Sequence, residues 1–142
     1  STYRIIEQWK NAETKKVEDN EICLVYVHYD GYPSGHPSET AEWLAKGKVV
    51  NGLGLSNSDL VFNGAGCLAA QLIHNYKDGP GGTYMYSLDS RGKNWEDYLY
   101  DIIVKPDQSI EYVCYENGDE PIEIFRGTPQ EFVDKYQKEV EA

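Results

Sequence analysis

The chain has 142 residues, 40% of them hydrophobic, and its 24 acidic and 13 basic side chains give a formal charge of −11. This length is typical of one domain, so we expect a single domain over residues 1–142. The acidic balance argues against direct binding to nucleic-acid backbones or anionic membranes, where basic patches supply the affinity. Twelve tyrosines against three phenylalanines favour interfaces, or simply tyrosine-rich strands in a small α+β domain.

The three cysteines are widely spaced and include no C-x-x-C pair. This pattern is typical of reduced thiols, so we expect a cytoplasmic protein. Cys23 and Cys114 fall within predicted strands, where a free cysteine usually packs as a small buried side chain. No apolar run approaches 18 residues, and no signal-peptide core is present, so we expect no membrane segment.

The first third of the chain predicts a hairpin followed by a helix. Residues 2–9 are rich in β-branched and aromatic side chains, and residues 21–29 are largely apolar on both faces. We expect these two segments to be strands joined by a polar turn over residues 11–20. Residues 37–46 are expected to form a short helix, because proline suits the first turn and Gly47 stands at the C-terminal cap position.

The middle of the chain predicts a second helix and a third strand. Residues 49–63 are expected to be an irregular connector with at most one helical turn. Residues 64–76 repeat apolar side chains every four positions, which indicates an amphipathic helix that ends at the glycine-rich breaker 78–82. Residues 83–88 alternate as a strand, and residues 89–96 form a polar loop.

The last third predicts a second hairpin, an edge strand and a helix. Residues 97–105 and 110–115 alternate around a proline-containing turn, and residues 122–125 form a short edge strand. Thr128 and Glu131 match a capping box that begins an amphipathic C-terminal helix. These elements predict an α+β domain with a mostly antiparallel sheet of five to six strands and about three helices packed on it.

Polar and aromatic side chains are concentrated at the corner between the second strand and the first helix, where His28, Tyr29, Asp30, Tyr32 and His36 follow one another closely. Two histidines and a carboxylate suit a divalent metal or acid–base chemistry. The spacing matches no metal-ligand motif, however, and no third strong ligand is marked, so we expect no metal. The plainer alternative is that Asp30 caps the turn through its own backbone.

Anion binding and nucleophilic chemistry have weaker signals elsewhere. Residues 64–66 could offer backbone amides to an anion at a helix start, and Arg91 with Lys93 could meet a phosphate, although a solvent loop is the plainer alternative. Cys67 stands at the same helix start, but His74 lies two turns away and is too distant to activate it. No catalytic motif is complete, and we expect no cofactor.

The run His28-Tyr-Asp-Gly-Tyr-Pro33, with Gly35 soon after it, resembles a motif of a widespread group of small uncharacterised proteins encoded by phages and prophages. In that group the motif ends a strand and a helix follows, and a later strand is similar to Asp97-Tyr-Leu-Tyr100. The resemblance covers roughly residues 2–46 and 95–115. It implies a viral or mobile-element context, with the host cytoplasm as the location, and it implies no reaction.

A small acidic chain of this kind, without a complete catalytic constellation, is expected to interfere with a host defence system by binding. The expected partner is a host protein, which the acidic tail and exposed tyrosines would contact, or a small nucleotide-type ligand. The chain could also form a homo-oligomer. The candidate ligand-binding residues are His28, Tyr29, Asp30, Tyr32, His36 and Arg91. The alternatives are a small hydrolase or metal-dependent enzyme acting at His28, Asp30 and His36, and a structural virion component.

Overall fold

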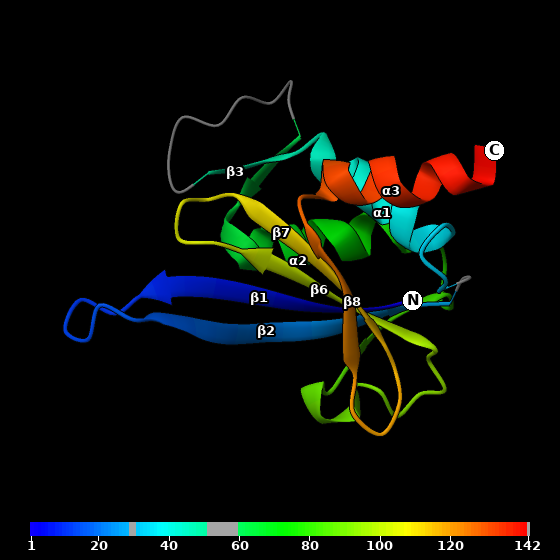
Figure 1. Ribbon diagram of the computed structural model, residues 1–142, viewed down its shortest axis with the longest axis horizontal. Coiled ribbons are helices and arrows are strands. Elements are labelled where there is room, and N and C mark those ends of the chain that lie inside the picture. The colour runs from blue at the N-terminus through cyan, green and yellow to red at the C-terminus, as the bar shows by residue number, and fades with distance from the viewer. Residues whose placement is uncertain (29–30, 51–59, 142) are drawn as a thin grey trace.

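The computed structural model describes residues 1–28, 31–50 and 60–141, which form one α+β domain (Figure 1). The strands are β1 (Thr2–Lys10), β2 (Val17–Val27), β3 (Lys48–Val50), β4 (Val61–Asn63), β5 (Thr83–Tyr86), β6 (Tyr98–Val104), β7 (Ile110–Glu116) and β8 (Ile122–Gly127). The helices are α1 (His36–Ala45), α2 (Gly64–Tyr76) and α3 (Pro129–Glu141), and a 3₁₀ turn, η1, spans Leu88–Ser90. None of the described helices is long and apolar enough to cross a bilayer.

The main sheet has six strands in the order β5-β2-β1-β6-β7-β8, and β3 pairs with β4 in a separate small sheet. Neighbours in the main sheet are antiparallel except β1 and β6, which run parallel with Tyr3 opposite Tyr100. The predicted fold, a mostly antiparallel sheet of five to six strands with about three helices, is confirmed. The parallel pair was not predicted from the sequence.

The N-terminal hairpin is longer than predicted, because the polar turn closes early. The Asn11 side-chain oxygen accepts hydrogen bonds from the backbone N–H groups of Glu13 and Thr14. The backbone N–H of Asn11 donates to Lys16 O at 2.9 Å. Lys15 adopts the left-handed region, with φ of 62°, to complete the turn. The expected turn over residues 11–20 is therefore wrong in its second half, since β2 already begins at Val17.

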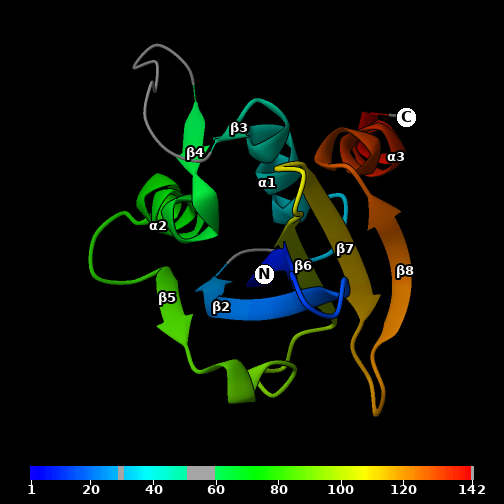
Figure 2. The same cartoon turned by 90° about the vertical axis from the view of Figure 1, so that its left-hand side faces the viewer.

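All three helices lie on one face of the sheet, with α1 between α2 and α3 (Figure 2). The sheet presents to them a layer of tyrosines, Tyr3, Tyr100 and Tyr112, whose side chains are fully buried. The opposite face has its own smaller apolar cluster of Ile6, Ile103 and Val113, so the central strands are covered on both sides. Most of the hydrophobic burial that stabilises the domain lies on the helix side.

The segment that joins α1 to α2 is more regular than predicted. Instead of an irregular connector over 49–63, the structure forms β3 and β4 as a parallel pair on either side of residues 51–59, which lie outside the described part. Burial explains the pairing, because Val49 and Phe62 face the core with 5% and 0% of their surface exposed. Phe62 also packs edge-on against Trp43 of α1, with ring centroids 5.1 Å apart.

The predicted capping box at the start of α3 is confirmed. The Thr128 N–H donates to Glu131 Oε1 at 2.9 Å, and the Glu131 N–H donates to Thr128 Oγ1 at 3.1 Å. This reciprocal pair satisfies two amides that have no partner inside the helix. It also aims the helix so that Phe132 enters the core and packs against Tyr112, with ring centroids 4.8 Å apart.

We expect Gly47→Ala to destabilise the domain, because a Cβ at this position would lie 2.3 Å from Phe62 Cε2. The expected loss of unfolding free energy is about 1–3 kcal/mol, the usual cost of overpacking. Gly66→Ala is the matched control: it lies in the first turn of α2, where an added Cβ meets nothing within 4 Å. Urea unfolding of both variants checks the prediction, and equal midpoints for the two would contradict it.

Candidate functional site

The side chains predicted to gather at the corner between β2 and α1 lie partly at the surface and partly in the core. His28, directly after β2, is exposed; its backbone N–H donates to Gly82 O at 2.7 Å, and its Nδ1 lies 3.2 Å from the Tyr26 hydroxyl. Tyr32 is also at the surface, with 49% of its area exposed. The candidates Tyr29 and Asp30 lie outside the described residues.

His36 points away from that surface and into the core. Only 6% of its area is exposed, and its Nδ1 lies 2.9 Å from the Tyr3 hydroxyl. The Tyr3 hydroxyl also forms a hydrogen bond with Thr40 Oγ1, at 2.8 Å. Thr40 Oγ1 in turn forms a hydrogen bond with the Tyr76 hydroxyl, at 3.0 Å. Burial lowers the pKa of His36 to about 4, so the ring is neutral at physiological pH. The corner therefore does not present His36 beside His28 and Tyr32.

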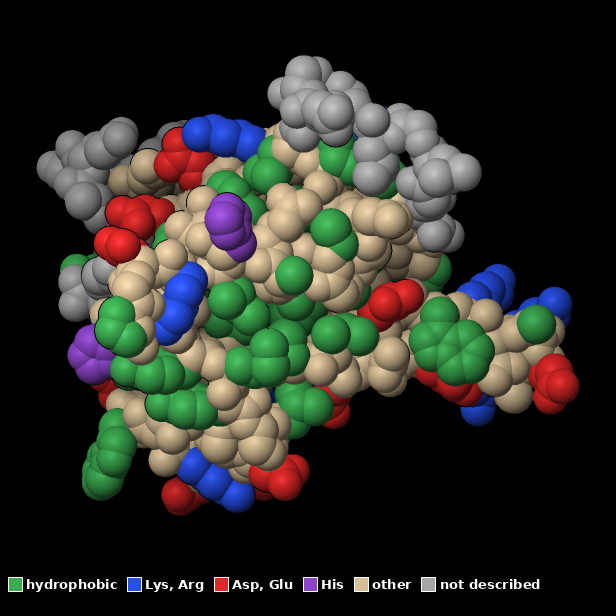
Figure 3. Space-filling view, turned by 180° about the vertical axis from the view of Figure 1, so that it is seen from behind, with side chains coloured by type: hydrophobic (Ala, Val, Ile, Leu, Met, Phe, Trp, Pro, Cys, Tyr) green, Lys and Arg blue, Asp and Glu red, His purple; other side chains and the backbone are tan. Residues whose placement is uncertain are grey.

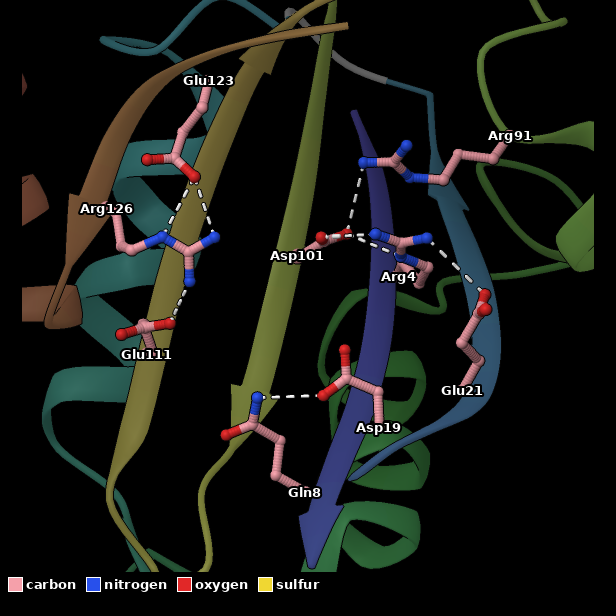
Figure 4. A network of polar contacts seen from close by, with 9 residues as sticks. All are labelled: Arg4, Gln8, Asp19, Glu21, Arg91, Asp101, Glu111, Glu123 and Arg126. Carbon is pink, nitrogen blue, oxygen red and sulfur yellow. Dashed lines mark hydrogen bonds and ion pairs between the residues drawn. The ribbon is translucent and has the colours of Figure 1, made fainter. Parts of the chain in front are cut away.

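Arg91 is held on the sheet face that is turned away from the helices, as Figure 4 shows. Its guanidinium lies 3.4 Å from Asp101 Oδ1. Arg4 approaches the same carboxylate with two nitrogens, at 2.9 and 2.7 Å, and Asp101 is only 1% exposed. The structure therefore does not bring Arg91 together with His36, since the two side chains lie on opposite faces of the sheet.

The loop between β5 and β6 is anchored at several points along its length. Arg91 stacks on the ring of Tyr115, with the guanidinium carbon 5.1 Å from the ring centroid. Asn117 donates from its side-chain amide to Gly92 O at 3.1 Å and to Glu96 O at 2.8 Å. The Glu96 carboxylate in turn accepts from the Thr2 hydroxyl at 2.8 Å. These contacts hold residues 91–97 in one position against the sheet.

The anchored loop forms one wall of a hollow of about 280 Å³ at the end of the sheet where β2 ends and β6 begins. Its walls are mainly aromatic and acidic, and the residues that line it are Ser1, Tyr26, Gly31, Tyr32, Asn94, Trp95, Glu96, Asp97 and Tyr98. Among the described residues, neither Glu96 nor Asp97 forms an ion pair with a cation. The hollow therefore holds two carboxylates that are not ion-paired within the described residues, with the Ser1 amino group also in its lining. Burial, with further contributions from Tyr86 and the Glu96 carboxylate, raises the pKa of Tyr26.

Trp95 lies at the rim of this hollow, and both its exposure and its backbone conformation are unusual for a tryptophan. Its side chain is 99% exposed, although the loop that carries it is well anchored. Its backbone has φ of 65°, in the left-handed region that costs a bulky residue about 1–2 kcal/mol. Neither packing nor backbone preference accounts for a tryptophan at this position. An exposed aromatic residue on strained backbone is a pattern that clusters at functional sites.

A row of tyrosines extends the hollow onto the edge strand β5. Tyr26 lies 5.6 Å from Tyr86, and Tyr84 stacks parallel to Tyr86 at 5.9 Å between ring centroids. Tyr84, Met85 and Tyr86 are 41%, 64% and 38% exposed. Figure 3, which looks from the side of α2 and β5, shows hydrophobic side chains gathered across the middle of this face. Together with the hollow, this row forms one continuous surface, here called the aromatic surface.

The residues at the centre of this surface were not predicted as candidates. Trp95 was expected in a polar loop, and neither it nor Tyr26 or Glu96 was among the predicted site residues. One signal was available: Trp95 is a lone large aromatic between Asn94 and Glu96, in a segment with no apolar periodicity that could bury it. Such an isolated tryptophan has no predicted partner in the core and is therefore a candidate surface residue.

The other predicted chemistries receive little geometric support within the described residues. No group of three or more histidine, cysteine or acidic side chains there could hold a metal. Cys67 is half-buried in α2, and its Sγ lies 3.3 Å from the Gln71 side-chain amide of the same helix. His28 and His36 each face a tyrosine hydroxyl rather than a serine or cysteine.

No known family model matches the chain, and neither the curated proteins nor the solved structures include a detectable match. The resemblance to phage-encoded proteins stays a prediction.

We expect the stability of the domain to fall as the pH drops from about 6.5 toward 4, because the unfolded chain protonates His36 before the folded chain does. The sign follows from a folded pKa lower than the unfolded one, and the loss is at most about 3 kcal/mol. Unfolding free energies measured from pH 7 to pH 4 check this. His36→Gln should flatten the profile in this window and His28→Gln should not; identical profiles for all three proteins would refute the assignment.

We expect Trp95→Gly to leave the unfolding free energy unchanged or to raise it by up to about 1 kcal/mol, since glycine adopts positive φ without strain. Trp95→Ala keeps the strained backbone and serves as the control. Thermal unfolding of both variants gives the answer. A loss larger than 1 kcal/mol in either would mean that the indole packs against the domain and is not held out for a partner.

Proposed function

We propose that this is a non-enzymatic binding protein that docks on another protein through its aromatic surface, with Trp95 as the central anchor. The supporting observation is the strained and fully exposed tryptophan on an anchored loop. Tryptophan and tyrosine are the residue types that most often dominate interface energetics, because they bury large area at small entropic cost. Pre-positioning by the loop lowers that cost further.

The size and charge of the hollow favour a protein partner over a small nucleotide-type ligand. Its volume of about 280 Å³ is at the lower limit of pockets that enclose a small molecule. Glu96 and Asp97 would repel a phosphate placed there. Arg91, the cation predicted to meet that phosphate, is engaged by Asp101 and Tyr115 instead. A protein side chain is the better fit.

The biological setting of this proposal comes from the motif at residues 28–33. Its resemblance to phage-encoded proteins favours an accessory protein that blocks a host system, and we propose that the block is steric. Within the described part of the motif, Gly31 and Tyr32 line the hollow. His36, three residues after the motif, secures the start of α1 to the sheet. A motif that shapes a docking site needs no catalytic group.

We expect Trp95→Ala to weaken binding to the partner by about 30-fold or more, the effect of removing a hot-spot residue worth at least 2 kcal/mol. The measurement is affinity purification of the tagged protein from host cells, with quantitative comparison of what each variant retains. Trp9→Ala is the matched control, because Trp9 is 46% exposed on the projecting β1–β2 hairpin, at the far end of β1 (Figure 1).

A partner retained by the unmodified protein and by Trp9→Ala, but lost from Trp95→Ala, supports the proposal. Purified partner should then give the same ranking of dissociation constants by calorimetry. If no protein depends on Trp95 while all three samples remain folded by circular dichroism, the docking function is wrong.

A further inference from the structure

We propose that the hollow beside Trp95 receives an arginine side chain from a basic segment of the partner protein. This inference rests on the docking function proposed above and adds the chemistry of the group that enters. It is supported by three observations: the fixed Glu96 carboxylate beside the exposed Asp97 carboxylate, neither ion-paired within the described residues; aromatic walls around them; and a volume suited to one long side chain.

The Glu96 carboxylate is held in a position where it could accept from a guanidinium. Glu96 Oε1 accepts from the Asn94 N–H at 2.7 Å, and Glu96 Oε2 accepts from the Thr2 hydroxyl at 2.8 Å, so the group is locked in one orientation. Each oxygen has two lone-pair sites, and one on each remains for an incoming donor. Asp97 lies next to it and is exposed, with its backbone carbonyl fixed by the Asn117 N–H at 2.8 Å.

The aromatic walls suit a cation as well as an apolar stem. Trp95, Tyr26 and Tyr32 border the hollow, and a guanidinium over such ring faces gains about 0.5–2 kcal/mol, most of all over tryptophan. The methylene stem of arginine would contact the same rings while its head reaches the carboxylates. Lysine has no planar group to stack and fits this arrangement less well.

An arginine held between a tyrosine ring and a carboxylate already occurs within the fold. Arg91 lies over the ring of Tyr115 at 5.1 Å and meets the Asp101 carboxylate at 3.4 Å. The hollow offers the same pair of partners, a tyrosine face and a carboxylate, on the outside of the molecule and without an arginine from the described chain. A formal charge of −11 would also steer a basic segment toward this surface.

The test uses two peptides that differ in one group. One has a central arginine flanked by glycine and serine, and the other has citrulline, the uncharged isostere, at the same position. Binding is followed by NMR through the indole N–H of Trp95, assigned by its loss in Trp95→Phe. We expect saturable shifts with the arginine peptide, weakening as salt is raised, and at least tenfold weaker binding of the citrulline peptide.

The variant Glu96→Gln/Asp97→Asn removes both charges while keeping the shape of the hollow. It should bind the arginine peptide at least tenfold more weakly than the unmodified protein, and Glu123→Gln, a surface carboxylate on β8 paired with Arg126, should bind it normally. Equal affinity for the arginine and citrulline peptides, or no effect of the double variant, would overturn the inference.

Comparison with the natural partner separates the two proposals. If Trp95→Ala abolishes partner binding while the double variant keeps it within twofold, the docking function stands and the arginine inference is wrong. If neither change affects the partner, the docking function itself fails. Loss of binding in both, with the citrulline peptide inactive, supports both proposals.

Discussion

A single buried carboxylate, Asp101 on the central strand β6, links the sheet to the surface that we propose for binding. It is 1% exposed and lies on the face opposite the helices, where an unpaired charge would be costly. Two arginines neutralise it: Arg4 from β1 fixes the parallel strand pair, and Arg91 fixes the loop that precedes β6 (Figure 4). Trp95 and Glu96 follow four and five residues later in that loop, so their placement depends on this charge.

The tyrosines explain how the other face of the sheet holds the corner. Tyr100 donates to Gly31 O at 2.7 Å and Tyr112 donates to Pro37 O at 2.9 Å, while the Tyr3 hydroxyl meets His36. Burial raises the pKa of each of these phenols, so they remain protonated and able to donate. The sheet thus secures the chain on both sides of the corner, and the tyrosine excess has a structural as well as a surface role.

Structure that depends on neighbouring residues could be predicted from patterns in the sequence. Contacts between residues far apart in the sequence could not. The capping box of Thr128 and Glu131 and the periodicity of α2 are complete within one segment, so both predictions were confirmed. The pairing of β1 with β6 and the inward turn of His36 depend on residues far away in the sequence, and no spacing rule indicates them. For the site, the sequence pointed to the corner but not to the loop opposite it, because the two meet only after the sheet assembles.

The parallel pairing of β1 with β6 also sets the order in which the domain can form. During synthesis the β1–β2 hairpin leaves the ribosome long before β6, so one border of β1 has no strand beside it until Tyr100 arrives opposite Tyr3. Closing so long an intervening chain is entropically slow. Until then the nascent hairpin exposes Ile5 and unpaired backbone groups along one edge of β1, the features that favour edge-to-edge association.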